Sequence, residues 1–329
     1  MTRKLFFLIL IFTKAMLNSQ NLNNRLVKPP FLSKGDTIAI VAPAGVLKNQ
    51  QEVIANARAL AESWGLKVIY GKHIFNQNHH FAGTDNERYR DFQDALNNRF
   101  VKAIWCAKGG YGSVRILDKL DFTAFKKNPK WIIGYSDITA FHSHIHNLGA
   151  ETLHAMMGNS VQKETEVIAQ SIETLRKALF GEALSYTIPS SKYNRVGKAK
   201  AVLVGGNISI LASLLGSSSQ ISVDDKILFI EDIGEYKYAI DRMLQSLKRA
   251  GYFEKVKAVV VGSMHEIKKN TTPWGSSIEE LIADAIPKHI PLLFGFPAGH
   301  HPDNRALVMG RTAILTIRKQ GDSDLKFEF

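Results

Sequence analysis

The sequence lacks the features that cross-link a chain or hold it in a bilayer. Cys106 is the single cysteine among 329 residues, which excludes an intramolecular disulfide and any metal site built from several cysteines. No apolar run approaches the ~18 residues that a membrane-spanning helix needs, so we expect no stable membrane insertion. No internal repeat or low-complexity tract is present. A chain of this length is expected to form two domains of ordinary size.

Acidic side chains are in the minority. There are 30 Asp and Glu residues against 42 Lys and Arg, which gives a formal net charge of +12 at pH 7. This surplus favours anionic partners such as nucleic acid, a membrane surface or a cell-wall polymer. The basic residues are scattered, however, and no basic stripe is interleaved with aromatic residues, so we expect no nucleic-acid partner.

The first 20 residues have the pattern of a signal peptide. Two early positive charges precede eight apolar residues, 5–12, a segment too short to span a bilayer. This pattern predicts a periplasmic or secreted protein. Lys14 interrupts the apolar segment and no clean small-x-small cleavage site follows, so an amphipathic tail on a cytoplasmic protein is the alternative.

The first half of the chain alternates strand patterns with helical periodicities. Residues 36–45 predict a buried strand that ends in a Pro-Ala-Gly turn, and a helical pattern follows. Three further strand-to-helix units come next, and Thr84 and Glu87 predict a capping box at the start of one helix. Such a series implies parallel strands in a covered sheet, with the ligand site at the carboxyl ends of the strands.

After about residue 160 the pattern changes. A predicted helix near 163–180 leads into a stretch rich in Ser, Gly and Lys, which we interpret as the crossover between domains. The remainder combines apolar runs with helical segments and closes with two alternating runs around a turn. We therefore expect a parallel-sheet domain at 32–165, a linker at 166–195 and a smaller β-rich α+β domain at 196–329.

A serine stands between the fourth strand pattern and its helix, in the segment GYSDI. In a strand-to-helix elbow the hydroxyl of Ser136 would project beyond the sheet edge, where the free N–H groups of the helix start also point. Gly134 permits the tight backbone of such an elbow. The alternative is that Ser136 only caps the helix, as most serines do at this position. The segment departs from the G-x-S-x-G pattern of α/β hydrolases, so that motif is not claimed.

A serine becomes a strong nucleophile when a base removes its proton and a third group orients that base. Glu231 follows the apolar run KILFI, at the predicted carboxyl end of a strand. His300 lies in GFPAGHHP, a glycine- and proline-containing loop after another apolar run. The order Ser136, Glu231, His300 matches one known triad order. The alternatives are an ion pair or helix cap for Glu231 and a hydrogen-bonded loop position for His300.

Other candidate sites are weaker. Ser113 follows a glycine-rich turn of the kind that brings backbone N–H groups to a ligand. Cys106 lies inside an apolar run and is expected to be a buried apolar residue. His142 and His146 share a helix face but have no acidic partner, so no metal site is expected. The turns GGYG and VGGN complete no dinucleotide fingerprint, and no cofactor is expected.

Six segments occur in the order GTDNERYRDFQDAL, AKGGYG, IIGYSDITAFH, LVGGNISIL, FIEDIGEYKYAIDRML and GFPAGH. Their order and spacing resemble the LD-carboxypeptidase family of serine peptidases, which also contains the microcin C self-immunity peptidases. The resemblance runs from about residue 34 to the C-terminus. In that family the serine of the G-[YFH]-S-D segment is the nucleophile, the glutamate of the E-D segment orients the base, and the histidine that closes the last segment is the base. The matching residues here are Ser136, Glu231 and His300.

The resemblance implies a flavodoxin-like N-terminal domain, a homodimer, a site without metal, and cleavage of the L,D-peptide bond of murein tetrapeptides with release of D-alanine. The self-immunity relatives imply an alternative, hydrolysis of acyl-sulfamoyl nucleotides, for which Trp274 is the candidate residue to stack on a base. A muropeptide-binding module without turnover is a third alternative. Residues 153–158 read LHAMMG where relatives commonly have His-Gly-Pro, a departure in the predicted pocket wall.

Two further roles complete the predicted site. The N–H groups of Asp137 and of the turn at Gly109 and Gly110 are expected to hold the oxyanion of the reaction. Lys108 is the candidate partner for the C-terminal carboxylate of the substrate, and a solvated surface lysine is the alternative.

Overall fold

The N-terminal domain is a parallel sheet with one antiparallel strand added at its edge. The computed structural model describes residues 26–162 and 166–328, so the predicted signal peptide lies outside the described residues. The strands are β1 (Thr37–Val41), β2 (Lys67–Tyr70), β3 (Val101–Cys106), β4 (Trp131–Gly134), β5 (Thr152–His154) and β11 (Leu307–Met309). They lie in the order β11-β5-β4-β3-β1-β2, and the strands from β5 to β2 are parallel. Because this is the flavodoxin-like strand order, the predicted fold of this domain is confirmed.

Helices cover both faces of this sheet, because residues on both sides of its strands are apolar. They are α2 (Gln51–Ser63), α3 (Asp85–Asn97), α4 (Ser113–Leu117), α5 (Thr123–Lys127), α6 (Thr139–Asn147) and α7 (Ala169–Phe180). On β1, Ile38 faces the core that contains α2 and α7, whereas its neighbour Ala39 faces the core that contains α3 and α6. The predicted capping box is present, with Thr84 and Glu87 each accepting the other's backbone N–H at the start of α3.

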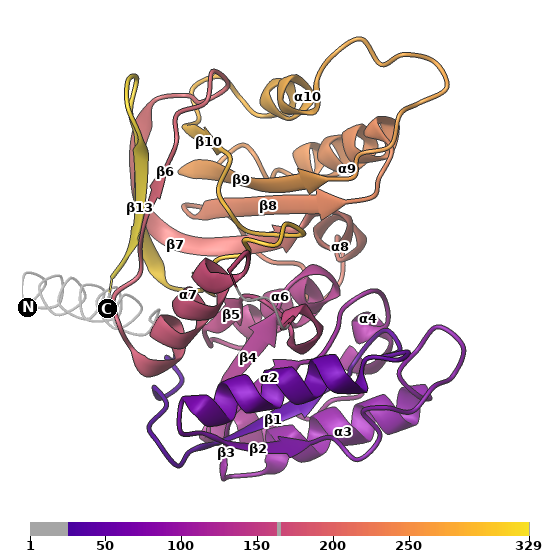
Figure 1. Ribbon diagram of the computed structural model, residues 1–329. Coiled ribbons are helices and arrows are strands. Elements are labelled where there is room, and N and C mark those ends of the chain that lie inside the picture. The colour runs from indigo at the N-terminus through magenta and orange to yellow at the C-terminus, as the bar shows by residue number, and fades with distance from the viewer. Residues whose placement is uncertain (1–25, 163–165, 329) are drawn as a thin grey trace, which may run out of the picture.

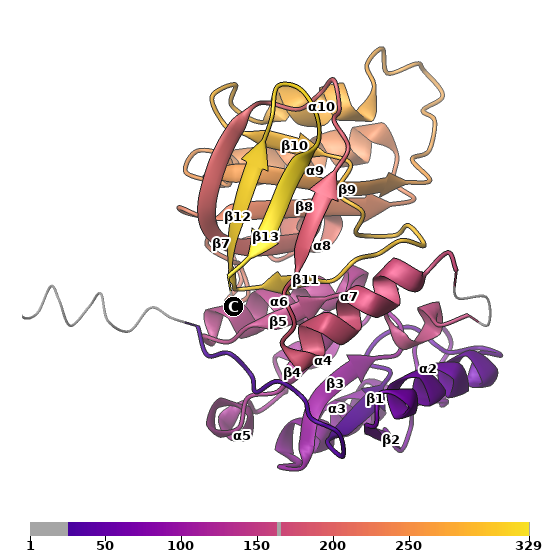
Figure 2. The same cartoon turned by 60° about the vertical axis from the view of Figure 1, so that its left-hand side comes forward.

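The C-terminal domain is a mixed sheet of seven strands. The strands are β6 (Ser185–Ile188), β7 (Gly197–Asn207), β8 (Ile227–Ile233), β9 (Ala258–His265), β10 (Leu292–Phe294), β12 (Thr312–Ile317) and β13 (Ser323–Phe327). The order is β10-β9-β8-β7-β12-β13-β6. Strands β7 to β10 are parallel, and β12, β13 and β6 continue from β7 as an antiparallel set, side by side in Figure 2. The predicted β-rich second domain is therefore confirmed.

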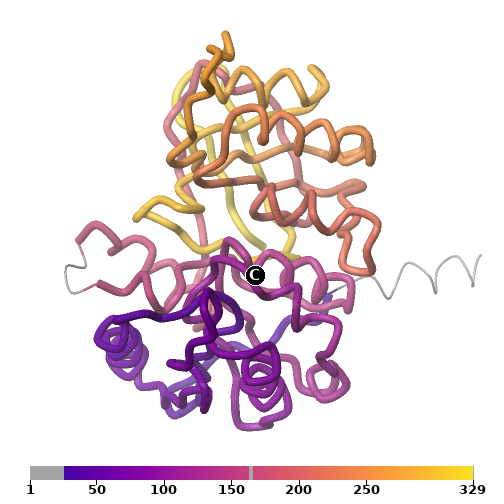
Figure 3. The backbone as a smooth tube through the Cα atoms, turned by 90° about the vertical axis from the view of Figure 1, so that its right-hand side faces the viewer, coloured from indigo at the N-terminus to yellow at the C-terminus, as the bar shows by residue number. Residues whose placement is uncertain are grey.

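Three helices, α8 (Ile208–Ser213), α9 (Lys237–Arg249) and α10 (Ile278–Ala285), cover the outer face of the parallel strands. The inner face takes part in one apolar core that continues from the N-terminal sheet, where Ile133 and Leu153 lie, to Phe229 and Val260 of the second sheet. The domains lie one above the other as two lobes (Figures 1 and 3). Apolar packing therefore fixes the position of one lobe on the other.

Two segments depart from the boundaries expected from the sequence. The predicted helix near 163–180 is present as α7, which packs in the shared core, but residues 166–195, predicted to be a linker, also contain β6, which pairs with β13. Tyr186 and Ile188 are buried although the surrounding composition is polar, which explains why the strand was not predicted. In addition, β11 leaves the C-terminal domain and pairs with β5 of the first sheet. Within the described residues, no helix has the length and apolar character needed to cross a bilayer.

Candidate active site

Ser136 stands directly after β4, at the carboxyl edge of the first sheet. Its backbone lies in the left-handed region at φ +61°, a conformation that costs a residue with a side chain roughly 1–3 kcal/mol. A 3-10 turn, Ser136–Ile138, leads into α6, and neither helix start has a side-chain cap. The bend is tight, because a Cβ on Gly134 would lie 2.7 Å from the Ile138 side chain. Ser136 is therefore held in a strained elbow, and its hydroxyl caps neither helix.

The hydroxyl of Ser136 instead meets an imidazole from the other domain. Its Oγ lies 2.9 Å from Nε2 of His300, and Nδ1 of His300 lies 2.7 Å from Oε2 of Glu231. The Glu231 side chain is fully buried, while 12% of the His300 side chain is exposed. The structure thus brings together the three side chains that the sequence indicated, from the elbow, from β8 and from the loop after β10.

Glu231 is oriented by a residue that the sequence analysis missed. The side-chain amide of Asn207 donates to Glu231 Oε1 at 3.2 Å and to Asp232 Oδ1 at 3.0 Å. Asn207 ends β7 and also caps α8, where its side chain accepts the N–H of Ile210. The signal was present in the segment VGGNIS, since asparagine between a strand and a helix is a preferred capping residue.

The loop that carries His300 is fixed on both sides of the imidazole. The backbone N–H of His300 donates to Ser263 Oγ at 2.8 Å, and that of Gly299 donates to Asn304 Oδ1 at 3.0 Å. Gly299 has φ +114°, and a Cβ there would lie 2.7 Å from Glu231 Oε2. Only glycine therefore leaves room for the carboxylate next to the imidazole.

The partly buried ring of Tyr135 and the buried ring of His154 lie behind this group. The ring of Tyr135 is 5.0 Å from that of His300, and burial together with nearby Glu231 raises the pKa of Tyr135 to about 12. His154, on β5, lies 6.0 Å from Tyr135 and 5.0 Å from Phe229 of the second sheet. Among the described residues, neither ring nitrogen of His154 has a hydrogen-bond partner, and burial lowers its pKa well below the ordinary value. His154 is therefore a neutral residue at the junction of the two domains.

The predicted oxyanion residues lie beside the elbow. A Cβ on Gly109 would be 3.3 Å from the Ser136 Cβ, 3.4 Å from Met157 Cε and 3.5 Å from the backbone nitrogen of Asp137. Met157, in the departing segment LHAMMG, thus forms part of the wall next to Gly109. Gly110 follows with φ +96°. The turn and the start of the elbow therefore flank the same space next to the Ser136 side chain.

Asp137 is buried, and its carboxylate accepts the backbone N–H of Ser113 at 2.8 Å. Burial raises the pKa of this carboxyl group. Lys108 is half-buried, and its Nζ donates to the carbonyl of Val46 at 2.8 Å, so it is not a freely solvated lysine. Its role toward a substrate stays a prediction.

The weaker candidates occupy structural positions. Ser113 is fully buried at the start of α4. Cys106 is buried, which raises the pKa of its thiol and confirms the expected apolar position. His142 lies with Nε2 2.9 Å from the carbonyl of Gly134, and burial lowers its pKa to about 4.

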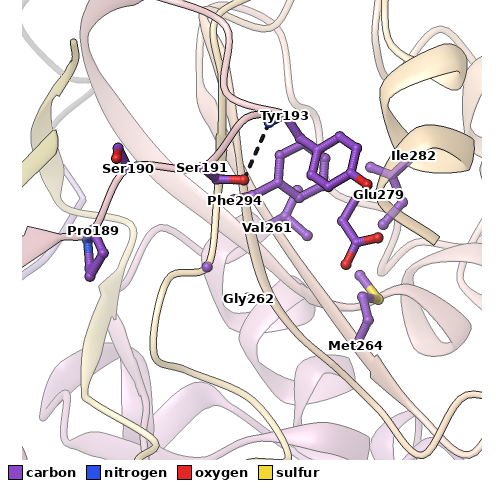
Figure 4. Close-up of a pocket in the computed structure, with 11 residues that line it drawn as sticks. Pro189, Ser190, Ser191, Tyr193, Val261, Gly262, Met264, Glu279, Ile282 and Phe294 are labelled. Atoms are coloured by element: carbon purple, nitrogen blue, oxygen red, sulfur yellow. Dashed lines mark hydrogen bonds between the residues drawn. The ribbon is translucent and has the colours of Figure 1, made fainter. Parts of the chain in front are cut away.

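Two hollows occur on the surface of the second domain. One, of about 350 Å³, is lined by residues that include Tyr193, Met264, Glu279 and Phe294, and Figure 4 shows the Glu279 carboxylate between Tyr193 and Met264. The other, of about 660 Å³, is lined by Tyr236, Tyr238 and the loop segment 270–274. None of the residues Ser136, Glu231 and His300 lines either hollow.

Two family models match the chain. The model of the LD-carboxypeptidase N-terminal domain matches residues 38–155, and that of the LD-carboxypeptidase C-terminal domain matches residues 200–315. The chain belongs to the LD-carboxypeptidase family. Membership in this family makes the protein a peptidase. Ser136 lies within the first matched range, and Glu231 and His300 lie within the second.

Relatives of this LD-carboxypeptidase family member include a "Probable murein peptide carboxypeptidase" from Bacillus subtilis. That protein is 37% identical over 302 residues, which cover 89% of this chain and 92% of the relative. The crystal structure of a muramoyltetrapeptide carboxypeptidase from Oxalobacter formigenes matches with a TM-score of 0.80 and 28% identity, over 89% of this chain and 99% of that one. MccF in complex with glutamyl sulfamoyl guanosine matches with a TM-score of 0.81 over 92% and 99% of the two chains; at 24% identity, this likeness shows the fold alone.

Proposed function

We propose that this protein is a serine-type LD-carboxypeptidase that hydrolyses the L,D-peptide bond of murein tetrapeptides and releases the C-terminal D-alanine. The observation that carries the proposal is the continuous contact from Ser136 through His300 to Glu231, at 2.9 and 2.7 Å, on a strained elbow. The names of the relatives, a murein peptide carboxypeptidase and a muramoyltetrapeptide carboxypeptidase, support this substrate class.

In the first half of the reaction, Ser136 Oγ attacks the carbonyl carbon of the residue before D-alanine while His300 Nε2 takes the hydroxyl proton. Glu231 accepts the Nδ1 proton in a hydrogen bond, which fixes the tautomer of the imidazole and stabilises its protonated form. His300 then returns the proton to the amine of D-alanine as the peptide C–N bond breaks. D-alanine leaves, and the rest of the peptide remains on Ser136 as an ester.

In the second half, water replaces D-alanine. His300 takes a proton from the water while the water oxygen attacks the ester carbonyl. His300 then gives the proton to Ser136 Oγ as the ester bond breaks. The tripeptide leaves with a new carboxylate, and the serine hydroxyl is restored. Burial of Glu231 and of most of the His300 side chain strengthens the electrostatic support of both steps, because the local dielectric constant is low.

Both halves pass through an oxyanion. We assign its stabilisation to the N–H groups of Asp137 and of the Gly109–Gly110 turn, which flank the Ser136 side chain. Each such donor is worth about 3 kcal/mol of barrier, a factor of about 100 to 1,000 in kcat. We assign to Lys108 the role of binding the C-terminal carboxylate of the substrate, which belongs to D-alanine.

Two further properties belong to this proposal. The family resemblance supports a homodimer, which light scattering of the purified protein tests. The N-terminal charge and apolar pattern supports export, which cell fractionation and N-terminal sequencing of the mature chain test.

The central experiment is mass spectrometry of defined muropeptides incubated with the purified protein. We expect loss of one alanine from tetrapeptides and no loss from pentapeptides. Ser136→Ala should remove this activity and also labelling by a fluorophosphonate probe, while Ser113→Ala should still be labelled. If Ser136→Ala keeps more than a few per cent of the parent rate, the serine mechanism is wrong. If only acyl-sulfamoyl nucleotides are hydrolysed, the substrate class is wrong.

A further inference from the structure

Three exposed aromatic side chains gather around one hollow on the second domain. Tyr236, Tyr238 and Trp274 are 40%, 46% and 37% exposed, and all three line the hollow of about 660 Å³. The two tyrosine rings are stacked, with centroids 5.5 Å apart and planes inclined by 20°. Large rings left in solvent and gathered in one place are characteristic of a binding surface.

The rest of the lining carries no charged side chain, and all of it except Pro273 is polar. It consists of Asn270, Thr271, Thr272 and Pro273. The Oδ1 atom of Asn270 is buried and accepts no hydrogen bond from any of the described residues. Because this oxygen is shielded from solvent, it is not available to a ligand in the hollow. The hollow therefore suits a ligand with an apolar face and hydroxyl groups.

The hollow lies at the same sheet edge as the candidate active site, but away from Ser136. Tyr236 comes five residues after Glu231, so their Cα atoms are separated by at most ~18 Å. The loop that carries Asn270 and Trp274 leaves β9 at His265, whose ring is 6.3 Å from that of His301. In Figures 1 and 3 this loop between β9 and α10 lies on the outer part of the second domain, remote from the N-terminal sheet.

We propose that this hollow binds the N-acetylated sugar of a glycan-linked tetrapeptide, an inference that rests on the proposed function. The apolar C–H face of a pyranose packs on an aromatic ring, and its hydroxyls match the two threonines. Lys268 Nζ and the Arg242 guanidinium carbon lie over the Tyr236 and Tyr238 rings, each 5.4 Å from the ring centroid, so Trp274 is the ring on which we expect the sugar to pack.

The position favours a sugar over a nucleoside. In a murein tetrapeptide three amino acids separate the scissile bond from the sugar, a span of roughly 10 Å when extended, and the sugar's own linker adds to it. In an acyl-sulfamoyl nucleoside the ribose joins the scissile acyl group through the sulfamoyl unit alone. A base would therefore lie close to Ser136, whereas this hollow lies on the outer part of the domain.

The test compares D-alanine release from a free tetrapeptide and from the same tetrapeptide linked to its N-acetylglucosaminyl-N-acetylmuramyl disaccharide. We expect the wild-type protein to prefer the glycan-linked substrate, measured as the ratio of the two kcat/KM values. Trp274→Ala should lower this ratio by roughly three- to tenfold through KM, the effect of one lost ring contact. Trp274→Tyr should retain most of the ratio. Phe100→Ala, which removes a ring that is 65% exposed on the first domain, is the matched control and should leave the ratio unchanged.

Direct binding separates this proposal from the proposed function. Calorimetry with the disaccharide alone should give a signal for the wild-type protein that weakens in Trp274→Ala, even if neither tetrapeptide is cleaved. A ratio near one together with no disaccharide binding overturns the sugar site. Adenosine binding in place of the disaccharide, or a change of oligomeric state in Trp274→Ala, overturns it in favour of a nucleoside site or a subunit interface, respectively.

Discussion

The backbone N–H of Asn207 donates a hydrogen bond of 3.0 Å to Thr139 Oγ1, across the boundary between the two domains. Thr139 begins α6, three residues after Ser136, and the side chain of Asn207 holds Glu231. One contact therefore positions the serine of one domain relative to the carboxylate of the other.

Gly206→Ala should disturb this junction. Gly206 has φ +145°, and a Cβ there would lie 2.4 Å from Thr139 Oγ1. We expect the free energy of unfolding to fall by about 1–3 kcal/mol and kcat to fall at least tenfold, because the two halves of the site move apart. Gly216→Ala is the control, since Gly216 also has positive φ but nothing lies within 4 Å of the added carbon. Equal losses of activity in both variants would contradict the role of the junction.

Glu231→Gln should lower kcat by about 1,000-fold or more, because the amide cannot hold the required imidazole tautomer and leaves the protonated imidazole unsupported. D-alanine release under single-turnover conditions measures this effect. Glu279→Gln, a change of the same type in the hollow of about 350 Å³, should leave kcat near the parent value. A small effect of Glu231→Gln on kcat would mean that the Glu231 carboxylate does not support catalysis by His300.

Gly109→Ala tests the oxyanion assignment. The added carbon would lie 3.5 Å from the nitrogen of Asp137 and would fill the space beside the Ser136 side chain. We expect kcat to fall by about 100-fold, the effect of losing roughly one donor. Thermal unfolding should show a folded protein, and a parent-like kcat would exclude this space as the oxyanion position.

Lys108→Met should weaken recognition of the free C-terminus. The wild-type protein is expected to prefer a tetrapeptide that ends in D-alanine over one that ends in D-alaninamide. The variant should lose most of this preference through a higher KM for the carboxylate form, by roughly tenfold, as expected for a charge-assisted hydrogen bond. If the preference persists in Lys108→Met, another cation holds the carboxylate.

Stability should depend on pH through the buried histidines. Burial lowers the pKa of His154 and of His142, the latter to about 4, whereas histidine in an unfolded chain titrates near 6.5. Between these values the unfolded chain binds more protons, so the free energy of unfolding falls as pH decreases from about 6.5 toward 4. Each such histidine contributes about 1.4 kcal/mol per pH unit to this slope.

His154→Phe should therefore reduce the slope by about the contribution of one group, which urea unfolding at several pH values from 5 to 7.5 measures. The readout is the slope and not the stability at a single pH, because phenylalanine also changes the packing. His289→Phe, at an exposed position, is the control. An unchanged slope in His154→Phe would mean that His154 does not titrate in this range.

The sequence predicted the features that depend on local pattern. The elbow at Ser136, the capping box at Thr84 and the strand that carries Glu231 follow from short segments whose residue types have definite conformational preferences. The family resemblance added the identity of the three side chains. Their mutual distances required the structure, because they depend on how two sheets pack.

Partners that are distant in sequence were not predictable. Asn207, Ser263 and Thr139 hold the site through hydrogen bonds to residues far away in the sequence, and nothing in their own segments indicates which residue each will contact. The same holds for β6 and β11, whose apolar residues are compatible with either sheet. Periodicity shows which face of an element is buried but not what covers it.

The strand β11 has a consequence for how the two halves of the molecule move. The loop that carries His300 starts from β10 of one sheet and ends at β11 of the other, so it is anchored to both. Any hinge opening must stretch this span and draw the imidazole away from Ser136 or Glu231. The two domains therefore cannot separate without breaking a hydrogen bond of His300, and with it the path for proton transfer.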